Sequence, residues 1–162
     1  MSVSLALVLA IQARVPDECQ LTRHSGCSSK ASADFTHAGD AEAVRIAVSE
    51  LAPDLDAAIE GVIFAAYESA NRLDASGDGG KSTGAWQTID GGKTAKEQFA
   101  NWLIRRRTSL DKCGTLAKVA SGSCGRGLRL VYRRMLVKSA ILDSLRDDGI
   151  YDADLGQHNK EN

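Results

Sequence analysis

The chain has 162 residues, of which 43% are hydrophobic and 25% are charged. This composition is typical of a globular domain with enough chain to bury a core, and it excludes fibrous and wholly disordered proteins. The formal net charge is −1, but residues 1–80 carry 5 basic and 12 acidic side chains, whereas residues 81–162 carry 15 basic and 9 acidic ones. The basic half could approach an anionic polymer, although scattered Arg and Lys on helices are more often a solvated surface.

The residue types favour helices over strands. The chain has two prolines and three phenylalanines, and long stretches are rich in Ala, Leu, Glu, Lys and Arg. Alternating runs of Val, Ile, Thr and aromatic residues, which an all-β domain would need, are absent from the sequence. We therefore predict an all-α domain.

The first 40 residues differ from the rest of the chain. Residues 3–13 are apolar apart from Ser4 and Gln12, which is typical of the hydrophobic part of a secretory signal and too short for a helix that spans a bilayer. No basic residue precedes this run, so a buried N-terminal helix that stays in the mature protein is the equal alternative. We divide the chain into this segment with its following loop (1–40), a domain (41–146) and a polar tail (147–162).

The four cysteines form two near pairs, Cys19 with Cys27 and Cys113 with Cys124. Short-range disulfides would suit the intervening loops and would imply an oxidising compartment. Free thiols are one alternative. The other alternative is a metal site with His24, which lacks the usual ligand spacing, so we expect no metal.

Two helices are predicted in the middle of the chain. Asp40 can cap the first, which is expected to end near residue 52. The second, residues 55–68, is apolar on nearly every side, which places it in the middle of the fold. Within it, Glu60 is expected at the rim.

Two further helices are predicted in the basic half. Thr94 and Glu97 have the spacing of a capping box ahead of apolar residues at helical intervals. A last helix is expected over residues 127–145, and the polar residues after it are expected to fray.

Glu68 ends the apolar helix and stands just before a polar, glycine-rich turn. A carboxyl group there is expected to lie half desolvated at the edge of a cavity. Desolvation disfavours the charged form and raises the pKa of a carboxyl group, which suits a general acid. Glu60 lies about 80° around the helix from Glu68, so the two carboxyl groups should not share a face.

The turn after Glu68 is rich in Gly, Ser and Asp, which favours turns over helix. Glycine-rich turns can bind phosphate, but residues 77–82 lack the glycine spacing of a P-loop and a buried strand ahead of it. We therefore expect no nucleotide cofactor.

Three short motifs together resemble those of soluble lytic transglycosylases and goose-type lysozymes. The first is Glu68-Ser69. The second, Gly84-Ala85-Trp86-Gln87, begins sixteen residues after Glu68, and the third is Val119-Ala120-Ser121-Gly122. Residues 113–124 also resemble a cysteine-bracketed form of the third motif found in some lysozyme-like proteins. The resemblance covers roughly residues 41–146.

The resemblance implies a lysozyme-like helical domain with a cleft for alternating N-acetylglucosamine and N-acetylmuramic acid. Glu68 would protonate the glycosidic oxygen and then act as a base while the muramyl 6-hydroxyl closes an anhydro ring, without a cofactor. Trp86 would shape the cleft wall, and the family usually has Tyr where this chain has Val119. Substrate binding or orientation is assigned to six residues: Ser69, Ser82, Gly84, Trp86, Gln87 and Val119.

A hydrolytic variant would need a second carboxylate that holds a water molecule, about 6.5 to 9.5 Å from the acid in an inverting enzyme. Asp74, Asp78 and Asp90 are the candidates. All three lie in glycine-containing turns, where Asp commonly makes local hydrogen bonds. The sequence leaves ring closure and water attack both open.

Two functions are therefore carried forward. The first is cleavage of peptidoglycan glycan strands, in a protein that is exported to the periplasm or the medium or is associated with a virion. The second is a catalytically inactive glycan-binding or structural module of a virion or secretion apparatus. A nucleic-acid-binding domain has no recognisable motif here, and neither a nucleic-acid partner nor a stable membrane span is expected. The oligomeric state is not predicted.

Overall fold

The structure is a computed structural model that describes residues 3–16, 34–113 and 128–150, with side chains described for all of these except 108–113 and 128–135. The described residues form five α-helices and one small two-stranded sheet. The prediction of a mainly helical domain is therefore confirmed, whereas the sheet was not predicted. Among these residues, no helix is long and apolar enough to cross a membrane.

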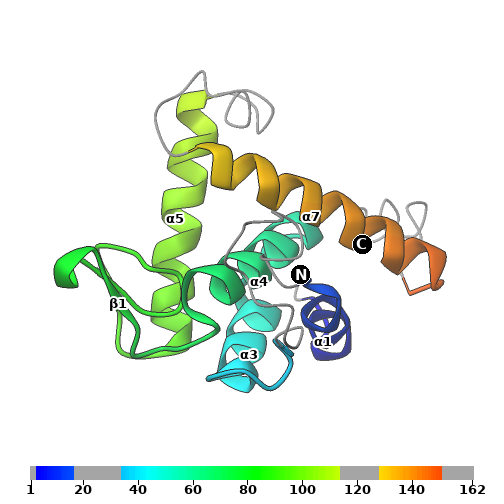
Figure 1. Cartoon of the computed structure of the whole chain (residues 1–162), viewed down its shortest axis with the longest axis horizontal. Helices are drawn as coiled ribbons and strands as arrows, with labels where there is room; N and C mark the ends of the chain where they lie inside the picture. The colour runs from blue at the N-terminus through cyan, green and yellow to red at the C-terminus, as the bar shows by residue number, and fades with distance from the viewer. Residues whose placement is uncertain (1–2, 17–33, 114–127, 151–162) are drawn as a thin grey trace, which may run out of the picture.

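Helix α4 lies at the centre of the fold (Figure 1). It contacts α1, α3 and α7, and α5 packs on α3. A short β-hairpin projects beside α5 at the edge of the molecule (Figure 1). The elements in chain order are α1 (Leu5–Arg14), α3 (Ala41–Leu51), α4 (Leu55–Ser69), β1 (Ser76–Gly77), the 3-10 turn η1 (Asp78–Gly80), β2 (Ser82–Thr83), α5 (Ala95–Cys113) and α7 (Leu128–Asp147).

The central position of α4 follows from its sequence. Asp54 caps the helix by accepting a hydrogen bond from the amide of Ala57 at 2.7 Å, and nine of its fifteen residues are buried. A Cβ atom on Gly61 would come within 2.7 Å of the Phe99 ring, so glycine allows α5 to approach closely. The prediction of a central buried helix over this segment is confirmed.

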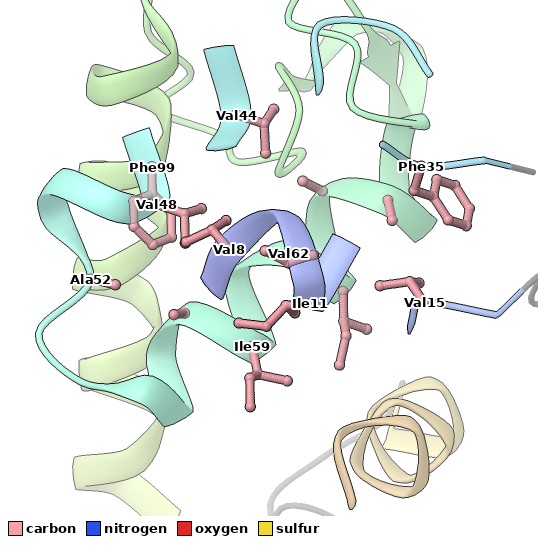
Figure 2. Close-up of a cluster of buried hydrophobic side chains, with 14 of the residues drawn as sticks. Val8, Ile11, Val15, Phe35, Val44, Val48, Ala52, Ile59, Val62 and Phe99 are labelled. Carbon is pink, nitrogen blue, oxygen red and sulfur yellow. The ribbon is translucent and has the colours of Figure 1, made fainter. Parts of the chain in front are cut away.

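Helix α1 is packed into the core. Val8 and Ile11 are fully buried, and Figure 2 shows them among side chains of α3 and α4, including Val48 and Ile59. The buried amide of Gln12 donates a hydrogen bond to the carbonyl oxygen of Ala41 at 3.1 Å. The N-terminal apolar segment is thus an integral helix of this fold.

Polar contacts also tie the segment around α1 to the rest of the molecule. The Tyr67 hydroxyl donates to the carbonyl of Pro16 at 2.8 Å. The Ser49 hydroxyl donates to the carbonyl of Val3 at 2.6 Å, and Arg14 donates to Ser144 on α7 at 3.1 Å. These bonds fix both ends of α1 against three other helices.

Two caps can be compared with their predictions. The amide of Glu97 donates to the Thr94 hydroxyl oxygen at 3.2 Å, which confirms one bond of the predicted capping box, whereas the Glu97 carboxylate accepts from the amide of Lys93 at 2.8 Å. Asp40 stands at the start of α3 but makes no side-chain cap bond. Its carboxylate instead accepts from the amide of Leu73 at 2.9 Å, because the loop that follows α4 passes beside it.

The prediction that Glu60 lies at the rim is wrong. Its exposed fraction is only 7%, because α5 and α7 cover this side of α4. The carboxylate accepts from Arg106 at 2.8 Å and lies 3.4 Å from the Lys138 ammonium group. Lys138 also lies 3.3 Å from Asp56, so this buried cluster pairs its charges and joins three helices.

Candidate functional site

The C-terminal end of α4 is shaped by a tight left-handed turn. Ala70 has a φ of 52° and Asn71 a φ of 64°. The amide of Asn71 donates back to the carbonyl of Ala65 at 3.0 Å, as in a Schellman-type helix end, where glycine is more common. Ala70 thus adopts a costly conformation directly after Glu68-Ser69, whereas Asn71 is a residue type that tolerates it.

Glu68 lies in the last turn of α4 and is exposed. The predicted half desolvation of its carboxyl group at the edge of a cavity stays a prediction. The apolar faces of α4 end before Glu68, and the neighbouring turn is polar. As predicted, Glu68 and Glu60 do not share a face of α4, since Glu60 is buried and Glu68 is exposed.

Ser69 joins this helix end to the second motif. Its hydroxyl oxygen lies 3.0 Å from the carbonyl oxygen of Ala65 and 2.9 Å from that of Ala85. The same oxygen accepts from the amide of Arg72 at 3.1 Å. The Ser69 hydroxyl therefore contacts the backbone of α4, of the loop after it and of the second motif.

The Gly84–Gln87 motif forms a turn against the start of the hairpin. The amide of Gly84 donates to the carbonyl of Ala75 at 2.9 Å. The Gln87 side chain donates to Ala75 at 3.2 Å and to the carbonyl of Gly84 at 2.8 Å. Gln87 has a φ of 50°, so this motif also contains a strained non-glycine residue.

Trp86 is a core residue in this structure. Its exposed fraction is 3%, its ring centroid lies 5.0 Å from that of Phe99, and its indole N–H donates to the carbonyl of Gly61 at 2.8 Å. The expectation of a cleft-wall residue therefore needs correction: the hydrogen bond to α4 turns the indole inward.

The hairpin between the two motifs has antiparallel register, with Ser76 opposite Thr83 and Gly77 opposite Ser82. Ser82 is buried, and its hydroxyl donates to the carboxylate of Asp78 at 2.9 Å. Ser82, predicted to bind substrate, thus uses its hydroxyl inside the hairpin.

The remaining candidate carboxylates are exposed and have nearby partners. Asp74 lies 3.7 Å from the Arg72 guanidinium group, and Asp90 lies 3.4 Å from that of Arg105. Both distances describe exposed pairs, which contribute little to stability. The partner of Asp74 is two residues away, whereas that of Asp90 lies on α5, so the local hydrogen bonding expected for Asp in turns stays a prediction.

Gln98 was not predicted from the sequence as a site residue, although its side chain contacts the second motif and the loop that follows α4. It is buried on α5, accepts from the amide of Ala85 at 2.9 Å and donates to the carbonyl of Leu73 at 3.1 Å. The sequence feature that could have identified Gln98 is its position between Ala95 and Trp102 on the apolar face of the helix. A polar residue on such a face needs a partner elsewhere in the fold.

Several predicted residues lie outside the described part. The third motif, including Val119, is one of them, as are Cys19, Cys27 and Cys124. Cys113 ends α5, but its side chain is not described. The predicted disulfides and the predicted role of Val119 in substrate binding therefore stay predictions.

No family model, curated protein or solved structure matches the chain. Its function must be argued from the geometry and from the resemblance of its motifs. The described geometry places the exposed carboxyl group of Glu68 at the end of α4, beside a turn held by polar side chains such as Gln98. Such an arrangement can donate and accept a proton at a surface that a polymer can reach.

Proposed function

We propose that this protein cleaves peptidoglycan glycan strands between N-acetylmuramic acid and N-acetylglucosamine, with Glu68 as general acid and then general base. One observation carries the proposal. The side chain of Ser69, next to Glu68, lies within hydrogen-bond distance of the carbonyl of Ala85, at 2.9 Å. Two motifs that the sequence separates by sixteen residues thus meet at one place, as a shared site requires.

The strained backbone supports the same location. Within the described residues, four non-glycine residues have positive φ: Ala70, Asn71, Asp78 and Gln87. All four lie in the segment that begins at Glu68 and ends with the second motif. Asn and Asp adopt positive φ readily, so the strain falls on Ala70 and Gln87, and such strain clusters at functional sites.

In the proposed reaction, a glycan strand lies against the end of α4 and excludes water from the Glu68 carboxyl group, which strengthens its interaction with the reacting atoms. Glu68 gives its proton to the glycosidic oxygen as the bond to muramyl C1 breaks. The resulting carboxylate takes the proton of the muramyl 6-hydroxyl while that oxygen bonds to C1. The products are an anhydromuramyl end and a free N-acetylglucosamine end.

Ring closure is the favoured route, because it requires one carboxyl group. Asp78 accepts a hydrogen bond from Ser82 within the hairpin, and Asp74 and Asp90 lie beside arginines. Water attack would require one of these groups to hold a water molecule instead.

The alternative is a glycan-binding module without catalysis. The exposure of Glu68 favours it, because a general acid usually relies on desolvation to hold its proton near neutral pH. Under this alternative, the protein would bind purified cell walls and leave their turbidity unchanged.

The deciding experiment compares the native protein with Glu68→Gln on suspensions of purified cell walls. We expect the substitution to slow clearing by about 100-fold or more, the range for loss of a general acid. Glu42→Gln is the matched control, since Glu42 is another exposed glutamate at a helix end, on α3, and should clear walls at the native rate. Clearing by Glu68→Gln at the native rate, or no clearing by the native protein, would refute the catalytic proposal.

The products then separate the two chemical routes. Mass spectrometry of fragments released by the native protein should show anhydromuramyl ends. Reducing muramyl ends, heavier by one water, would instead indicate hydrolysis.

A further inference from the structure

Gln98 makes hydrogen bonds to three separate segments around the proposed site. Its exposed fraction is 3%. Its side-chain oxygen accepts from the amide of Ala85 at 2.9 Å, and its nitrogen donates to the carbonyls of Leu73 at 3.1 Å and Gly92 at 2.9 Å. These partners lie in the turn of the second motif, in the loop after α4 and in the loop before α5.

The side chain is matched to this place in both chemistry and shape. An amide has two N–H donors and an oxygen acceptor, and Gln98 uses both kinds of group. A Cβ atom on Gly84 would lie 2.6 Å from the Gln98 amide carbon, so the amide packs directly against that glycine. Methionine would keep the approximate volume of Gln98 and lose all three bonds.

The bond to Ala85 has a counterpart on the other side of the same residue. Gln98 accepts from the Ala85 amide, while the Ala85 carbonyl oxygen lies 2.9 Å from the Ser69 hydroxyl oxygen. Ser69 is the neighbour of Glu68. Gln98 is therefore connected to Glu68 in two ways. One connection runs through Ala85 and Ser69, and the other runs through the loop at Leu73.

We propose that Gln98 is a positioning residue, which sets the place of Glu68 relative to the Gly84–Gln87 turn. The proposal rests on the proposed function for its effect on catalysis. Gln98 does not contact the acid itself and acts through the backbone that it holds. Small displacements of a reacting group can cost about 100-fold in rate, so loosening this backbone should affect turnover more than substrate binding.

Gln98→Met tests the proposal, with Gln12→Met as its matched control. Gln12 is also a buried glutamine on a helix, and it donates to the backbone carbonyl of Ala41 and accepts from Arg45, away from both motifs. Rates are measured on soluble glycan oligomers and are expressed per folded molecule. Gln98→Met should lower kcat about tenfold or more with little change in KM, while Gln12→Met should leave both within about twofold. Equal kcat values for the two variants would overturn the proposal.

Amide hydrogen exchange tests the positioning without any activity. In Gln98→Met, residues 69–75 and 82–92 should exchange about tenfold faster or more than in Gln12→Met, because the bonds that hold them are lost. Unchanged exchange in both segments would refute the proposed position-holding role. Should the native protein fail to clear cell walls, the proposed function falls, while this measurement still decides what Gln98 does.

The native protein provides a further check if Gln98→Met does not fold. The amide of Ala85 should be strongly protected from exchange although it lies in a turn, since Gln98 accepts its hydrogen bond. Exchange at the rate of an exposed loop amide would contradict the proposal.

Discussion

The core around α1 and α4 and the segment from Glu68 to Gln98 differ in the interactions that hold them, although Trp86 packs the segment onto the core. In the core, fully buried apolar side chains such as Val8, Ile11 and Ile59 pack against one another. In the segment from Glu68 to Gln98, single polar side chains such as Ser69 and Gln98 bond to distant backbone groups.

The two kinds of interaction contribute differently: apolar packing mainly sets the stability of the fold, and hydrogen bonds mainly set the position of particular groups. Apolar burial contributes about 1.5 to 3 kcal/mol for a large side chain, in proportion to area and without direction. A hydrogen bond contributes only about 1 kcal/mol net but fixes distance and angle. We therefore expect core variants to lose stability at constant turnover per folded molecule, and variants of the segment to lose turnover beyond their loss of stability.

The largest effect is expected from deletion of α1 through Arg14. The deletion removes Val8 and Ile11 from the core and exposes the apolar faces that they cover, a loss comparable to the total stability of about 5 to 15 kcal/mol of a domain. Cooperative thermal unfolding, followed by circular dichroism, should disappear. Leu9→Ser, at an exposed position of the same helix, should change stability by only about 0.5 kcal/mol. A cooperative transition in the truncated protein would show that α1 is dispensable.

The next largest effect is expected from Glu60→Ala. It leaves Arg106 and Lys138 without their buried partner, which should cost about 3 to 5 kcal/mol in the free energy of unfolding. The matched control is Glu50→Ala, which breaks an exposed pair with Lys96 and should cost at most about 1 kcal/mol. Urea unfolding of both variants measures the difference, and equal losses would mean that burial of the cluster is unimportant.

Gly84→Ala should cost about 1 to 3 kcal/mol and also slow glycan cleavage. The glycine has a φ of 86°, and an added Cβ would meet the Gln98 amide, so strain and collision act together. Gly79→Ala separates the two causes, since Gly79 has a φ of 67° with no atom near its added Cβ. It should lose stability through strain alone and keep its turnover. Equal turnover in both variants would rule out an effect of the collision on the site.

The smallest effect on stability, about 1 kcal/mol, is expected from Ser69→Ala. Turnover should nevertheless fall, because the link from α4 to Ala85 is lost. Ser49→Ala removes a similar bond, to the carbonyl of Val3, and should cost about the same stability at unchanged turnover. Combined with Gln98→Met, Ser69→Ala should show a coupling energy of about 0.5 to 3 kcal/mol. If the free-energy changes of the two substitutions simply add in the double variant, the two hydrogen bonds to Ala85 act independently.

Local rules predicted much of the helical framework. The apolar periodicity gave α4 almost to the residue, and Thr94 with Glu97 marked the start of α5, because helix propensity and capping depend on neighbours within one turn. The short hairpin was not predicted. Its pairing depends on glycine conformations and on the contact of Gln87 with Ala75, neither of which is visible as a pattern of alternating residues.

The site was predicted in outline and less well in detail. The motifs indicated that Glu68-Ser69 and Gly84–Gln87 belong together, and the bond from Ser69 to Ala85 joins them. The sequence did not predict three features: the burial of Trp86, the exposure of Glu68 and the hydrogen bonds of Gln98 to the second motif. Each depends on which helix covers which side chain.

The sequence by itself determined where the helices form, since helix propensity and capping depend on interactions within a few residues, and its motifs supplied the candidates for the proposed chemistry. Tertiary structure alone decided that Glu60 is paired in the interior while Glu68 faces solvent. It also decided that α1 belongs to the core and that an amide on α5 holds the turn beside the acid. Packing partners come from distant parts of the chain, and burial, pairing and orientation depend on those partners.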